Sequence, residues 1–276
     1  MSESVKQRPA FKWREGALCE AADRLAVEEP LEIRLAGRRF TLTMRTPGHD
    51  EELAAGFLMA EGFVNARGEL GEIRRLRDSK GAPDPNAIDV ILNVPAAGLR
   101  ERMQRNFVVS SSCGICGKTS IEAIERRIAP ITSTATIAPP ALLRLPAMMR
   151  EAQAVFAATG GLHAAALFAL ENAAAPALIV LREDVGRHNA VDKVVGFALA
   201  RDLLPLTRHA LMVSGRLSFE IVQKAAAAGV PILCAVSAPS SLAVELADDL
   251  GMTLVGFLRE PNFNIYTHPE RIVARA

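Results

Sequence analysis

The alternation of apolar and polar residues predicts mainly strands in the first third of the chain. Residues 31–44 alternate on either side of Gly37, as the two strands of a hairpin do, and residues 87–94 form another strand candidate. Between these segments, residues 49–62 have apolar positions at helical spacing and end on a glycine, which predicts a helix. Residues 81–86 contain a glycine and two prolines, so we expect a surface turn there.

The last part of the chain has a different pattern, in which short apolar runs alternate with helical periods. After a helix at 146–159, we expect strands at 164–170, 177–181, 209–213, 230–236 and 252–258, and helices at 189–200, 218–228 and 240–250. This alternation is typical of right-handed βαβ units, and it predicts a parallel sheet covered by helices on both faces. Ligands of such sheets bind beyond the carboxyl ends of the strands, near helix N-termini that favour anions. We therefore expect a polar, phosphorylated ligand at that edge.

Composition and charge narrow the class of protein. The 276 residues are 50% hydrophobic and 23% charged, with a net charge of +1, so nothing favours a nucleic-acid or membrane partner. The first residues lack an apolar signal region, and no long uncharged apolar run follows, which predicts a cytoplasmic protein. The patterns together predict a β-rich N-terminal lobe over residues 1–106, a loop over 107–118 and an α/β domain over 119–276.

A close cysteine pair is the strongest chemical signal. Cys113 and Cys116 lie in the stretch Ser-Ser-Cys-Gly-Ile-Cys-Gly-Lys. Structural zinc needs four ligands, but the other cysteines, Cys19 and Cys234, are far apart and the five histidines are isolated, so we expect no metal site. A thioredoxin-like disulfide exchanger would place such a pair between a strand and a helix, as here, although the glycines favour a looser loop.

Sulfur carriage is the third chemistry that the pair permits. A cysteine persulfide requires an exposed thiol of low pKa, and both Lys118 and the helix expected from Thr119 would stabilise a thiolate. Serines and glycines around the pair would give it reach between a donor and an acceptor. Two inert surface cysteines are the plain alternative. Spacing alone leaves redox exchange and sulfur carriage open.

The connection between the strand at 177–181 and the helix at 189–200 is rich in polar groups. Arg187 and the region around Asn189 are suited to hold a diphosphate, and His188 to hydrogen-bond the edge of a guanine or pterin. Alternatively, Asp184 pairs with Arg187 across the turn and Asn189 only caps the helix. Ser214-Gly-Arg is a weaker phosphate-binding candidate.

Several stretches together resemble one family, the formate dehydrogenase accessory sulfurtransferases called FdhD. They occur in the family's order over most of the chain: 45–53, 111–118, 159–163, 182–193, 214–220 and 265–269. The resemblance implies a protein that accepts sulfur from a cysteine desulfurase and passes it to the molybdenum cofactor, in its bis(guanine dinucleotide) form, before insertion into formate dehydrogenase. Cys113 would carry the persulfide, and Cys116 would assist or resolve it.

The resemblance also implies a binding segment, a fold and an assembly. The cofactor, or a guanine nucleotide at the same site, would be held by Phe257, Leu258, Arg259, Glu260, Pro261 and Asn262. The fold would be similar to that of cytidine deaminases, an α/β/α domain, and the protein would be a homodimer. Deamination itself is not expected, because the zinc ligand set His-x-Glu and Pro-Cys-x-x-Cys is lacking. The alternative functions are a cofactor-binding chaperone without a covalent sulfur step and a thiol-disulfide oxidoreductase.

Overall fold

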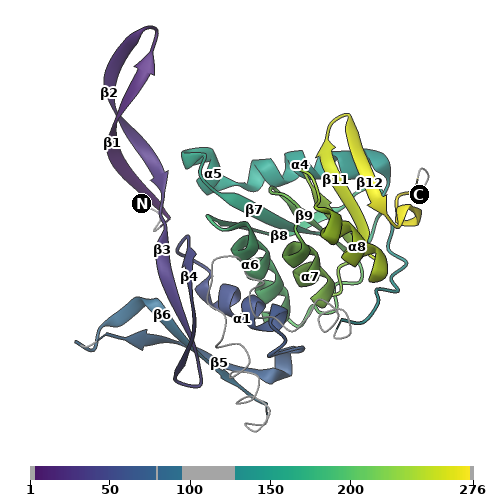
Figure 1. Cartoon of the computed structure of the whole chain (residues 1–276), viewed down its shortest axis with the longest axis horizontal. Helices are drawn as coiled ribbons and strands as arrows, with labels where there is room; N and C mark the ends of the chain where they lie inside the picture. Colours follow the sequence, from purple (N-terminus) through teal and green to yellow (C-terminus); the bar gives the residue numbers. More distant parts are fainter. Residues whose placement is uncertain (1–3, 79, 95–127, 274–276) are drawn as a thin grey trace.

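A computed structural model describes residues 4–78, 80–94 and 128–273 as three sheets and their helices (Figure 1). The six-stranded central sheet contains β7 (His163–Ala169), β8 (Ala177–Asp184), β9 (His209–Val213), β10 (Ile232–Ala235), β11 (Thr253–Arg259) and β12 (Asn262–Thr267). A four-stranded sheet contains β3 (Glu29–Leu35), β4 (Arg38–Arg45), β5 (Leu70–Arg77) and β6 (Pro83–Leu92), and a hairpin contains β1 (Val5–Arg14) and β2 (Ala17–Ala26).

The helices of the described residues follow the same numbering. They are α1 (Asp50–Ala60), α4 (Pro139–Ala152), α5 (Ala154–Thr159), α6 (Arg187–Ala200), α7 (Phe219–Ala227) and α8 (Ser241–Asp249), with short 3₁₀ turns at Arg67–Glu69 and Pro269–Arg271. None of the helices in this part of the chain is both long and apolar enough to cross a membrane.

The central sheet is mixed, which corrects the expected parallel sheet. Its order is β12-β11-β10-β9-β7-β8, and only β9, β10 and β11 pair in parallel. β7 runs antiparallel to both β8 and β9, and β12 runs antiparallel to β11. The βαβ pattern holds only where a helix connects successive strands, because β7 to β8 and β11 to β12 are joined by short turns.

Helices cover both faces of the central sheet. Alternate residues of its strands point to opposite sides, so Leu211 and Leu233 join the core formed with α6, α7 and α8, while Met212 and Cys234 join the core beneath α4. The first core continues through α1 into the four-stranded sheet. The α/β class is therefore confirmed. The likeness to cytidine deaminases and the division at residue 106 stay predictions, the latter because residues 95–127 lie outside the described part.

The N-terminal predictions agree well with the structure. The hairpin at 31–44 is β3 and β4, joined by Ala36 and Gly37, both with positive φ, as a tight two-residue hairpin turn requires. The helix expected at 49–62 is α1, and the strand expected at 87–94 is the second half of β6. β6 starts at Pro83, so the turn expected at 81–86 is shorter than the sequence predicted.

Two other predictions were wrong in their bounds. The helix expected at 146–159 is two helices, α4 and α5, and α4 begins at Pro139, where prolines fit the first turn because their missing N–H is not needed there. The segment 257–262, expected to follow the last strand, is the end of the β11–β12 hairpin: residues 257–259 complete β11, Glu260 and Pro261 form the turn, and Asn262 begins β12. The helix expected from Thr119 lies outside the described residues.

Candidate ligand site at the carboxyl edge of the central sheet

Two of the four cysteines lie in the described part of the chain, one exposed and one buried. Cys113 and Cys116 lie outside the described residues. Cys19 is exposed on β2, and Cys234 is buried in β10, where burial raises the pKa of its thiol. Cys234 is thus a core residue, as its apolar surroundings in the sequence predicted, and is a poor metal ligand or nucleophile.

One edge of the central sheet collects the polar segments of the sequence. β8, β9, β10 and β11 end there, and β7 and β12 begin there. The loops beyond β9 and β10 are joined, because Leu217 N donates to Ala238 O at 3.1 Å and Ser240 N donates to Leu217 O at 2.9 Å. Phe257 N in turn donates to Ser237 O at 3.1 Å. The three loops therefore form one continuous rim, the place where a ligand of an α/β sheet is expected.

Arg187 lies at this edge, at the first position of α6, which follows β8. Its Nε is buried and has no hydrogen-bond partner among the described residues. A Cβ added to Gly215 would lie 3.4 Å from Arg187 Cδ and 3.6 Å from His163 Nδ1, so the guanidinium arm, the β9 loop and the start of β7 meet at one point. A buried guanidinium nitrogen without an acceptor, at a helix N-terminus, is suited to bind an anion.

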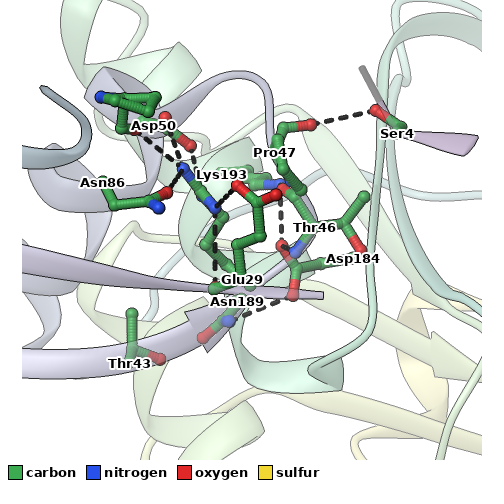
Figure 2. Close-up of polar contacts among 12 residues, drawn as sticks. Ser4, Glu29, Thr43, Thr46, Pro47, Asp50, Asn86, Asp184, Asn189 and Lys193 are labelled. Carbon is green, nitrogen blue, oxygen red and sulfur yellow. Dashed lines mark hydrogen bonds and ion pairs between the residues drawn. The ribbon is translucent and has the colours of Figure 1, made fainter. Parts of the chain in front are cut away.

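The alternative pairing of Asp184 with Arg187 is not what the structure shows. Asp184 is fully buried and bonds instead to Lys193 Nζ at 2.7 Å and to the Asn189 side chain at 3.0 Å (Figure 2). It also accepts from Thr46 N at 3.2 Å, and Lys193 donates to Thr46 O at 2.9 Å. Asn189 does not cap α6 either. This buried cluster fastens the segment after β4 to the start of α6 and leaves Arg187 available.

His188 is engaged by α7 rather than directed freely at the rim. Its Nε2 lies 3.2 Å from Ser218 Oγ and 3.2 Å from Glu220 Oε2. The other carboxylate oxygen, Glu220 Oε1, is buried without a hydrogen-bond partner among the described residues. Glu220 closes the 214–220 stretch of the sequence, whose pattern alone assigns it no role. The available signal was an acidic residue in the first turn of a helix that follows a parallel strand.

His163 titrates below the usual range for histidine. Burial lowers the pKa of its imidazole first, the nearby Arg187 charge lowers it further, and Asp184 partly opposes them. The imidazole is therefore neutral near pH 7 and adds no positive charge beside Arg187.

The predicted cofactor segment, residues 257–262, is the end of the β11–β12 hairpin and lies at the same edge of the sheet. Phe257 is exposed and has a positive φ of 51°, whereas Leu258 is fully buried in the core beneath α4. Arg259, Glu260, Pro261 and Asn262 are exposed at the tip. Backbone hydrogen bonds link β11 to the Ser237–Ser240 loop, and that loop to Leu217 in the segment against which Arg187 lies. Leu258 can offer a ligand its backbone, but its side chain is occupied in the core.

The fold and the site together define an α/β ligand-binding protein with an anion-binding group at its sheet edge. Comparison with known proteins is more specific: the model of the FdhD/NarQ family matches residues 26–273, and the chain belongs to this family. The "Sulfur carrier protein FdhD" of Mycolicibacterium paratuberculosis is 53% identical over 255 residues, covering 90% of this chain and 91% of the relative. The protein of the same name from Streptomyces avermitilis is 48% identical over 282 residues, covering 100% and 98%.

A solved structure supports the same assignment. A crystal structure from Desulfotalea psychrophila, described as that of a formate dehydrogenase accessory protein, superimposes with a TM-score of 0.74 at 27% identity. The match covers 98% of this chain and 99% of that one. The resemblance inferred from short motifs is thereby confirmed over nearly the whole chain.

Proposed function

We propose that the chain is a sulfur carrier for formate dehydrogenase, which takes persulfide sulfur from a cysteine desulfurase and transfers it to the molybdenum cofactor in its bis(guanine dinucleotide) form. The observation that carries this proposal is the family membership, with relatives named sulfur carrier proteins that share about half of their residues with this chain over nine-tenths of its length. The Cys-x-x-Cys pair supplies the chemical means. The proposal includes a cytoplasmic location and a homodimeric state.

Uptake of sulfur is a thiol exchange at Cys113. Its thiolate attacks the terminal sulfur of the persulfide on the desulfurase, a new S–S bond forms on Cys113, and the donor cysteine leaves as a thiolate. When the sulfur is delivered to the cofactor, Cys113 Sγ is no longer the nucleophile but the atom that is attacked. The Cys116 thiolate attacks Cys113 Sγ, the protonated terminal sulfur leaves as hydrosulfide to become a ligand of the molybdenum, and a Cys113–Cys116 disulfide remains. A cellular dithiol then reduces that disulfide.

The rim at the carboxyl edge supports the acceptor half of the proposal. The cofactor carries two dinucleotide diphosphates, and Arg187 Nε is a buried donor without a partner among the described residues, at the N-terminus of a helix. Arg259 is exposed on the segment that the family resemblance selects, and Phe257 and Pro261 offer apolar surfaces beside it. The cofactor is a substrate here, held while sulfur is added.

Complementation tests the covalent step. In cells that lack their own protein of this family, the chain is expected to restore formate dehydrogenase activity, and Cys113→Ala is expected to abolish restoration while cofactor binding persists. Cys19→Ala is the matched control, because Cys19 is an exposed cysteine on β2 and is expected to be neutral. Full restoration by Cys113→Ala would leave the chaperone function, without a covalent sulfur step, as the better account.

A further inference from the structure

Beside the rim lies a second buried polar atom without a hydrogen-bond partner among the described residues, and it is an acceptor where Arg187 Nε is a donor. Glu220 lies in the first turn of α7, and its side chain is only 12% exposed. Oε2 is engaged by His188 at 3.2 Å, but Oε1 is buried and accepts no hydrogen bond from the described residues. A buried carboxylate oxygen without a donor destabilises the protein without ligand, so a ligand that supplies N–H groups to it would gain binding free energy.

Glu220 and Arg187 border the same loop. The segment from Ser214 to Ser218 joins β9 to α7, the arm of Arg187 lies against Gly215 within it, and Glu220 follows directly on α7. His188, the neighbour of Arg187 on α6, contacts Glu220 itself. A buried acceptor and a buried donor, neither of which has a partner in the described part of the chain, thus border one loop at the edge where ligands of α/β sheets bind.

The combination selects a ligand with both an anionic part and a planar N–H edge. Guanine presents N1–H and the exocyclic N2 amino group side by side, which a carboxylate can accept together. Adenine offers no such pair of adjacent donors, and xanthine replaces the amino group by a carbonyl oxygen that a carboxylate repels. The phosphates of the same nucleotide would occupy the Arg187 end of the site.

We propose that Glu220 is the residue that recognises the guanine base of the nucleotide moiety, through N1–H and the 2-amino group, and that His188 and Ser218 position its carboxylate. This inference rests on the proposed function for the presence of a guanine nucleotide at the rim. It changes the role expected for His188 from a base contact to a positioning residue, because its Nε2 already lies at Ser218 Oγ and Glu220 Oε2.

The test compares the diphosphates of guanosine, inosine and xanthosine on the purified full-length chain, by calorimetry without any sulfur donor. The wild type is expected to bind GDP most tightly, the inosine form about 10-fold more weakly and the xanthosine form about 100-fold more weakly. Glu220→Gln exchanges one acceptor for an amide donor, so it is expected to weaken GDP by about 10- to 100-fold and to bind the xanthosine form more tightly than the wild type does. A gain of binding cannot result from misfolding.

Two further variants complete the design. Glu151→Gln removes a carboxylate from the exposed surface of α4 and is expected to change none of the three affinities. Arg187→Met is expected to weaken all three nucleotides equally, since it acts on the phosphates. If Glu220→Gln keeps the wild-type order, or the wild type does not distinguish the three bases, the role of Glu220 is refuted while sulfur carriage stands. If the wild type binds none of the three, the nucleotide site of the proposed function fails with it.

Discussion

At the scale of single residues, Asp192 is a buried carboxyl that the proposed chemistry does not use. It lies on α6 and pairs with Lys224 of α7 at 2.7 Å, with both residues almost completely buried. Burial raises the pKa of Asp192 to about 6, while the Lys224 charge and its hydrogen bonds oppose the rise. The pair therefore joins α6 to α7. Burial nevertheless makes the ionised form of Asp192 less favourable in the folded protein than in water.

This raised pKa makes Asp192 an exception to the usual acid sensitivity of carboxylates. Its contribution to stability is fully present below the unfolded pKa of 3.8 and is lost as pH rises through about 6. Compared with the double variant Asp192→Asn, Lys224→Met, which removes both charges, the wild type should lose roughly 3 kcal/mol of unfolding free energy between about pH 4 and pH 7. Urea unfolding at several pH values measures this difference. Parallel curves for the two proteins would show that Asp192 is not perturbed.

At the scale of elements, α1 and α6 pack so closely that neither Gly56 nor Gly196 has room for a side chain. A Cβ added to Gly56 would lie 1.9 Å from Asp192 O, and one added to Gly196 would lie 1.8 Å from Glu52 O. Both obstacles are backbone atoms, so neither can move as a flexible side chain would. The two glycines thus allow the N-terminal helix to dock directly onto the helix that presents Arg187 and His188.

Gly56→Ala should therefore destabilise the fold strongly. We expect a loss of about 3 kcal/mol of unfolding free energy, the upper part of the range for overpacked cores, because the added methyl group meets backbone. Gly68→Ala is the matched control, since nothing lies within 4 Å of its added Cβ, and it should change stability by less than about 0.5 kcal/mol. Thermal and urea unfolding measure both. Equal stability of Gly56→Ala and wild type would mean that the helices separate at little cost.

Strands that are marked by a local run of apolar residues were predicted accurately. β9 has the predicted bounds, His209–Val213, because a run of apolar residues is enclosed by polar loops. The direction of β7 was not accessible, since it depends on the register with β8 and β9 and not on any local pattern. β12 did have a local signal, because Phe263 and Ile265 alternate with polar residues, but no strand was expected after the one at 252–258.

At the scale of the whole molecule, the ligand site depends on segments that are distant in the sequence. The alternation of strands and helices predicted Arg187 in the connection just before a helix at 189–200, whereas the helix begins at Arg187 itself. The role of Glu220 was not predictable, because it depends on His188 reaching α7 and on the absence of a donor for Oε1 among the described residues. The burial of Leu258 was likewise set by packing against α4. Sequence predicted which segments meet at the rim, and packing decided which side chains remain available there.

The central claim is that Cys113 carries sulfur as a persulfide, and mass spectrometry of the intact chain and its peptides tests it most directly. After incubation with a cysteine desulfurase and cysteine, we expect a gain of ~32 Da, one sulfur atom, confined to the peptide that contains Cys113 and reversed by a thiol reductant. The Cys19 and Cys234 peptides should remain unmodified, the latter because burial keeps that thiol protonated. An unmodified Cys113 peptide under conditions in which the desulfurase is active would contradict the account.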